Sequence, residues 1–137
     1  MQFIAVLALV AFSQIPTAAS ADVCPGLPAS SGLAWQLKRG PDFDVCYAHE
    51  VGSTESRFGV YLGYAPGFDV AGAARLGEGR VAGRTVVWYK DDQGGTFGRQ
   101  TMVRVGKTGE WAHVWVLAKT SKELQDSLSV IENITLP

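Results

Sequence analysis

The sequence predicts an α+β fold, in which an antiparallel sheet of about five strands, ending in a C-terminal meander, packs against one C-terminal amphipathic helix. Short runs of aromatic and β-branched residues between glycine-rich turns indicate the strands. The last segment instead carries Leu124, Leu128 and Ile131 at the i, i+4 and i+7 positions of a helix. That apolar stripe must be buried, and a sheet is the only large surface that can cover it.

The turn signals place the strands in order along the chain. Two turns, at residues 91–95 and 106–109, join the last three strands into the meander. Residues 65–83 are rich in glycine and are expected to be a long loop or a broken element. The expected strands are residues 43–49, 57–64, 84–90, 97–105 and 110–118, after an irregular entry with a short segment at 33–37.

The predicted helix covers residues 121–132. Thr120 and Glu123 stand in the relation of a capping box, in which a hydroxyl and a carboxylate satisfy the first amides of a helix. The helix should therefore begin at Ser121 and bury Leu124, Leu128 and Ile131.

The first residues have the character of a secretory signal peptide. Residues 3–12 are apolar, but this run is shorter than the about 20 residues that a membrane-spanning helix needs. Small residues at Ala19 and Ala21 fit cleavage after Ala21. We therefore expect a signal peptide at 1–21 and a single secreted or periplasmic domain at 22–137, without stable membrane insertion.

The only two cysteines, Cys24 and Cys46, are expected to form a disulfide, because thiols of exported proteins are normally oxidised. A reactive thiol would need a lowered pKa and a neighbouring base. The spacing of the cysteines and histidines matches no metal-binding motif. Neither a metal nor another cofactor is expected.

The charge of the chain argues against nucleic acid as a partner. The sequence has 12 Lys and Arg against 13 Asp and Glu, a formal net charge of −1. Such a chain has no basic field that would attract a phosphate backbone.

No catalytic residue can be assigned from motifs. The sequence has no Gly-x-Ser-x-Gly, no His-Glu-x-x-His and no phosphate loop. His49 and Glu50 are adjacent, so on a strand they point to opposite faces and cannot form a simple acid/base pair.

The most informative pattern lies in the last strand. Large residues, Trp111, His113 and Trp115, alternate with small apolar ones, so both faces of this strand are apolar and the strand is expected to be central. Gly59 and Gly63 share one face of an earlier strand and leave room for an aromatic ring or a ligand. The candidate binding residues on the aromatic face are Trp88, Trp111, His113, Trp115 and Tyr61, with polar contacts from Arg104 or Arg99.

Two interpretations of this face stay open. In one it is core beneath residues 65–83; in the other it is an exposed groove that binds a ligand or partner. The second predicts a non-enzymatic binding module for a small apolar or glycan ligand, or for another envelope or extracellular protein, as an inhibitor or immunity protein would be. The alternative is a small secreted hydrolase that uses His113 as acid or base, which would need a carboxylate or hydroxyl beside His113 in a cleft.

We predict that the exported protein begins at Asp22 and carries a bond between Cys24 and Cys46. Mass spectrometry of protein recovered from the envelope or culture fluid, before and after reduction, should show the mass of residues 22–137 and an increase on reduction. Two free thiols, or a retained N-terminus, would contradict this prediction.

Overall fold

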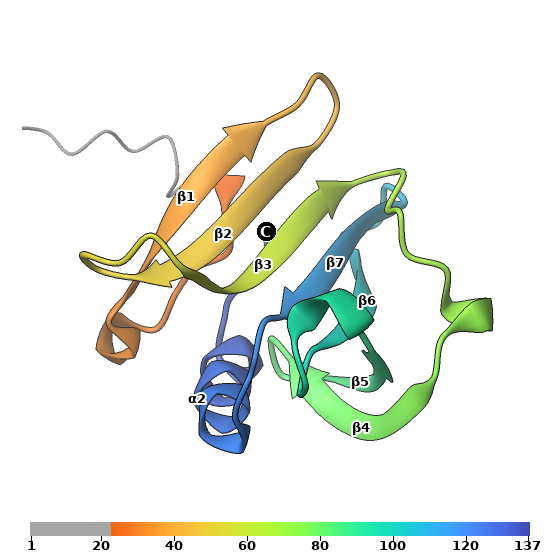
Figure 1. Ribbon diagram of the computed structural model, residues 1–137. Coiled ribbons are helices and arrows are strands. Elements are labelled where there is room, and N and C mark those ends of the chain that lie inside the picture. The colour runs from red at the N-terminus through yellow and green to blue at the C-terminus, as the bar shows by residue number, and fades with distance from the viewer. Residues whose placement is uncertain (1–22) are drawn as a thin grey trace, which may run out of the picture.

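The computed structural model describes residues 23–137; the predicted signal peptide at 1–21 lies outside the described residues. One curved antiparallel sheet packs against one helix, so the predicted α+β class is confirmed (Figure 1). Within the described part of the chain, no helix is long and apolar enough to cross a membrane. The elements are β1 (Leu33–Arg39), β2 (Asp44–Glu50), β3 (Ser56–Gly63), β4 (Arg75–Val81), β5 (Arg84–Lys90), β6 (Arg99–Val105), β7 (Glu110–Val116) and α2 (Ser121–Glu132).

The sheet has the strand order β1-β2-β3-β7-β6-β5-β4. The last long strand of the sequence, β7, therefore lies in the middle, between β3 and β6, as its two apolar faces predicted. Helix α2 contacts β3, β7 and also the far edge strand β4, so the sheet curves around the helix (Figure 1). Within residues 23–137, no α-helix covers the opposite face of the sheet (Figure 1).

The sheet has seven strands, so the prediction of about five was too low. The short segment predicted at 33–37 is part of a full strand, β1, which pairs with β2 over its whole length. Strand β4 falls inside residues 65–83, where a loop or broken element was expected. The glycines and charged residues of β4 do not give the usual sequence pattern of a strand. Charged residues are common in an edge strand such as β4. Gly79 is needed because a Cβ at this position would collide with the indole of Trp88.

Helix α2 begins and ends at the predicted residues. The amide of Glu123 donates to Oγ1 of Thr120 at 3.1 Å, and the Glu123 carboxylate accepts from the amide of Lys119 at 2.8 Å. This differs from the standard capping box only in that the carboxylate reaches the residue before the N-cap.

The C-terminal end of α2 is held by the turn between β4 and β5. The amides of Ala82 and Gly83 donate to the carbonyls of Ile131 and Glu132, both at 3.0 Å. The last carbonyls of a helix lack partners within the helix. This turn therefore supplies donors to them while it connects the two strands.

The core lies between the sheet and α2. Leu124 and Ile131 are buried in it, as predicted, whereas Leu128 is only partly buried at its margin. The expectation that all three are buried alike is therefore wrong for Leu128. Buried sheet residues in this core include Phe58, Val60, Leu62, Val103, Ala112, Val114 and Val116.

A disulfide joins Cys24 to Cys46 on β2, with their Cα atoms 5.9 Å apart, as predicted. The cysteines are 22 residues apart, a loop for which the chain-entropy model gives about 3 kcal/mol. The segment that follows Cys24 is fixed twice more. Trp35 donates from its indole to the carbonyl of Pro25 at 2.7 Å, and Gly26 pairs with Thr135 after the helix.

We predict that Ile131→Ala destabilises the protein by about 2–5 kcal/mol, the range for a fully buried large aliphatic side chain. Leu128→Ala should cost less, because Leu128 keeps part of its surface in water. The exposed Gln125→Ala is the matched control on the same helix and should change little. Urea unfolding with the disulfide intact measures all three, and equal losses for Ile131 and Gln125 would contradict the docking of α2.

Candidate functional site

The open face of the sheet carries the aromatic side of β7. Trp111, His113 and Trp115 are half-buried, whereas the alternate residues of β7 are fully buried toward α2. This face is therefore neither sealed core nor fully exposed. Register sets its neighbours: Trp115 lies between Gly59 and Gln100, His113 between Tyr61 and Met102, and Trp111 between Gly63 and Arg104.

Gly59 of β3 positions the indole of Trp115. A Cβ at Gly59 would overlap the six-membered ring of this indole, so the ring lies over bare backbone. The Tyr47 ring meets the indole edge-on, with centroids 6.0 Å apart. The space predicted at this glycine is thus filled by an aromatic ring of the protein itself. The indole lies over the backbone of β3 and is half-buried.

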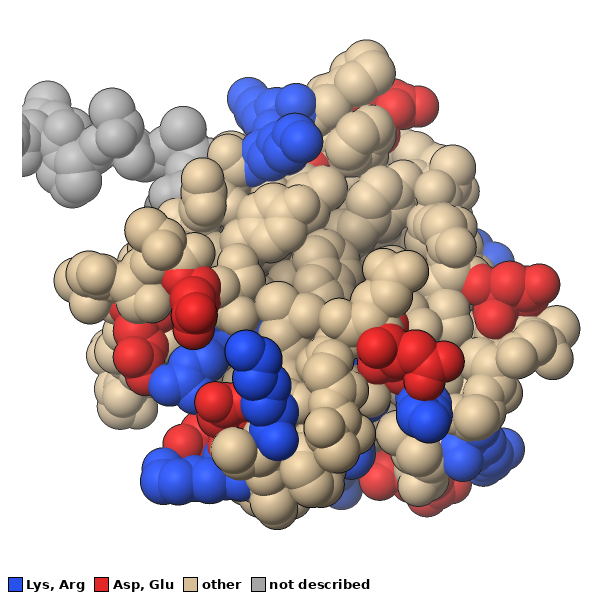
Figure 2. Space-filling view, in the orientation of Figure 1, with Lys and Arg blue, Asp and Glu red and all other residues tan. Residues whose placement is uncertain are grey.

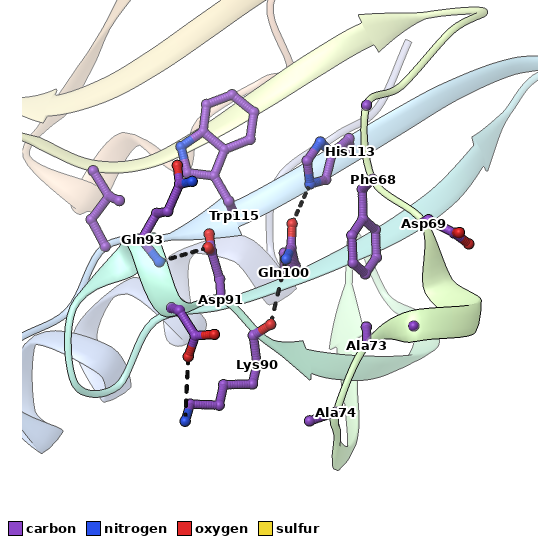
Figure 3. A pocket seen from close by; sticks show the side chains of 14 residues that line it. Phe68, Asp69, Ala73, Ala74, Lys90, Asp91, Gln93, Gln100, His113 and Trp115 are labelled. Atoms are coloured by element: carbon purple, nitrogen blue, oxygen red, sulfur yellow. Dashed lines mark hydrogen bonds and ion pairs between the residues drawn. The ribbon is translucent and has the colours of Figure 1, made fainter.

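Gln100 of β6 fixes the orientation of His113. The Nε2 atom of His113 lies 3.0 Å from Oε1 of Gln100, and the Gln100 amide nitrogen donates to the carbonyl of Lys90 at 3.4 Å (Figure 3). Because the amide nitrogen faces a carbonyl, the amide oxygen must face His113 and accept from Nε2. In the neutral imidazole, Nδ1 is then the nitrogen that accepts a hydrogen bond.

Two aromatic rings enclose the imidazole. Phe68, from the segment between β3 and β4, stacks on His113 with centroids 5.3 Å apart and 11° between the planes, and Trp115 lies 5.5 Å away. This burial lowers the pKa of His113 below its ordinary 6.5, while the negative charge of Asp91 acts in the opposite direction. His113 is therefore neutral at pH 7.

A cavity of about 890 Å³ opens beside these rings. His113, Trp115 and Phe68 form its aromatic part (Figure 3). Its polar groups are Asp69, Lys90, Asp91, Asp92, Gln93 and Gln100. The lining thus contains three carboxylates and one amine, and that amine is paired with Asp92 at 3.3 Å.

The charged side chains on this face lie around its edge rather than at its centre. Figure 2 shows a hollow over β3 and β7 that is lined by uncharged residues, with Lys, Arg, Asp and Glu gathered around it. The arrangement combines aromatic surface at the centre with hydrogen-bonding groups at the edge, as small-molecule sites usually do.

The structure brings together only some of the predicted site residues. His113 and Trp115 line the cavity. Tyr61 lies beside His113 on the same face, where it stacks on Phe43 with centroids 5.6 Å apart. Trp111 and Arg104 lie at the other end of β7 and interact with each other, the guanidinium carbon 4.3 Å from the indole centroid.

Trp88 does not belong to this surface, and its inclusion was wrong. It is 2% exposed and lies in the core on the helix side of the sheet. The register explains the error, because Tyr89 and not Trp88 aligns with Gln100 on the open face. Arg99, the alternative to Arg104, aligns with Val116 and so also belongs to the helix side.

Of the cavity residues, only His113 and Trp115 were predicted, and Phe68, Asp91 and Gln100 are the most informative of those missed. Phe68 lies in the glycine-rich segment at 65–83, where the sequence predicted a loop but singled out no residue. Asp91 was assigned to a turn, and it does accept from the amide of Gln93 at 3.1 Å while it also lines the cavity. Gln100 could have been found, because the predicted meander places it on the strand next to β7.

The chemistry open to the cavity is limited by its lining. Among the residues described, no Ser, Thr or Cys lines it, and no group of three or more His, Cys, Asp or Glu could hold a metal ion. In comparisons with protein-family models, curated proteins and solved structures, no significant match was found.

We predict that folding stability falls as the pH drops below 6.5, the ordinary pKa of histidine, because the unfolded chain then binds a proton that folded His113 resists. The loss continues until the pH passes the lowered pKa of the folded state. His113→Gln should remove this part of the pH dependence. Asp91→Asn should lower the pKa of His113 further, since it removes the charge that raises it.

An NMR titration of the His113 imidazole, with urea unfolding at each pH, measures both effects. An imidazole that titrates above 6.5 in the folded protein would contradict the assignment of burial as the dominant influence.

Proposed function

We propose that this protein is a non-enzymatic binding module of the periplasm or extracellular space that holds a glycan in the cavity beside β7. The observation that carries the proposal is the pairing of a half-buried indole, Trp115, with a rim of carboxylates and amides. A sugar ring has an apolar face of C–H groups and an edge of hydroxyls. Aromatic rings suit the first, and carboxylate and amide groups suit the second.

The charge of the cavity narrows the class of glycan. Asp69, Asp91 and Asp92 outnumber Lys90, and His113 is neutral, so the lining is negative at pH 7. A sugar acid would meet repulsion from these carboxylates. Neutral sugars and sugars that carry an amine fit the site better.

The other ligands considered from the sequence fit less well. A purely apolar ligand would take water from the carboxylates and amides without replacing their hydrogen bonds, which is unfavourable. A protein partner usually docks on a broader, flatter surface, whereas this site is a cavity of a size typical for small ligands.

Export of the protein is part of the proposal. The Cys24–Cys46 disulfide supports it, because such bonds persist in oxidising compartments. The predicted signal peptide points the same way.

A small secreted hydrolase remains the second candidate, and one observation favours it. Asp91 lines the same cavity as His113 and its charge acts on the imidazole. Against it, Nε2 of His113 is engaged by Gln100, and no hydrogen bond joins His113 to a carboxylate among the described residues. If the protein cleaves a glycan, His113→Ala should abolish cleavage and leave binding measurable.

We predict that Trp115→Ala weakens glycan binding at least about tenfold, a change of about 1.4 kcal/mol. Trp111→Ala is the matched control, because it removes the same side chain from the same face of β7 but outside the cavity. Both variants should lose less stability than Phe58→Ala, whose ring is fully buried.

Calorimetry with neutral, amine-bearing and uronic acid oligosaccharides, together with thermal unfolding, checks these expectations. Equal effects of Trp111→Ala and Trp115→Ala, or a preference for the uronic acids, would contradict the proposal.

A further inference from the structure

A second cavity, of about 510 Å³, lies past the end of β7. It is formed by the turn between β2 and β3, by Gly94 and Gly95, and by the start of α2. Gln93 and Leu117 line both this cavity and the first one. The two cavities therefore share a border.

Backbone hydrogen bonds hold that border in place. The amide of Leu117 donates to the carbonyl of Arg57 at 3.0 Å, and the amide of Ala118 donates to the carbonyl of Gly94 at 2.8 Å. The chain that leaves β7 thus runs between the start of β3 and the turn after β5. Gln93, whose side chain is exposed, lies at this border, and Figure 3 shows it reaching toward the Trp115 indole.

The second cavity differs from the first in its chemistry. It contains no aromatic side chain, and its charged groups are of both signs. Arg57 pairs with Glu50, while the exposed Lys119 forms no ion pair with another described residue. This cavity offers donors and acceptors to hydroxyls but no surface on which a sugar ring could stack.

We propose that the two cavities form one groove for an oligosaccharide chain, with one sugar ring against Trp115 and later units hydrogen-bonded beside Lys119. This inference rests on the proposed function and adds the length and direction of the ligand. A protein that binds a monosaccharide would need only the first cavity. A groove that continues past Gln93 and Leu117 would bind a longer saccharide chain more tightly than a short one.

Calorimetric titration with β-1,4-linked glucose and N-acetylglucosamine oligomers of increasing length tests the inference. The hexasaccharide of the series that binds should bind at least about tenfold more tightly than its disaccharide. Lys119→Leu should weaken the hexasaccharide several-fold and leave the disaccharide unchanged. Lys107→Leu, an exposed lysine in the turn at the opposite end of β7, is the matched control and should alter neither.

Backbone amide shifts locate the ligand independently of any variant. The disaccharide should shift amides around Trp115 and Gln100, and the hexasaccharide should shift those of Gly95 and Lys119 as well. Equal affinities for the two lengths, with shifts confined to the first cavity, would overturn the extended groove and leave the proposed function standing. Failure of every oligomer to bind, or binding of a lysine-rich peptide in their place, would overturn both.

Discussion

The position of β7 in the centre of the sheet is the constraint on which the rest of the structure depends. One face of β7 must be small enough for α2 to approach, and Ala112, Val114 and Val116 meet that need. No α-helix of the described residues covers the other face, where Trp115 packs against Tyr47 and His113 stacks on Phe68. The alternation of large and small residues along β7 therefore produces both the core on one face and the candidate site on the other.

Glycines on β3, next to β7, leave room for the aromatic rings of the open face. The indole of Trp115 occupies the space beside Gly59, and the ring of Tyr61 occupies the space beside Gly63. Gln100 contributes an amide that orients His113 and takes part in the cavity lining. Strand register fixes Trp115 and His113, so these two rings of the site are held by the sheet itself, which suits a binding surface that is largely preformed. Phe68, the third ring, comes from the segment between β3 and β4.

The sequence alone predicted those features that depend on local periodicity. The helix, its capping residues and the two-faced character of β7 follow from spacing within a few residues, and each is present in the structure. Features that depend on pairing between distant residues were not predicted. Strand β4 was expected to be a loop or a broken element, Trp88 was placed on the wrong face of the sheet, and the stacking of Phe68 on His113 was not foreseen. A shift of one residue in the register moves each side chain to the opposite face of the sheet. The face that Trp88 occupies therefore cannot be predicted until the register of β5 with its neighbours is known.

We propose that the indole of Trp115 is a stacking surface for a sugar. Intermolecular nuclear Overhauser effects between the ring protons of a bound oligosaccharide and the four assigned tryptophan indoles test it most directly. If Trp115 stacks on the sugar, cross-peaks are expected from the sugar C–H protons to Trp115, with none to Trp111 or to the buried Trp88. Cross-peaks to Trp111 alone, or a bound saccharide without contact to Trp115, would contradict it.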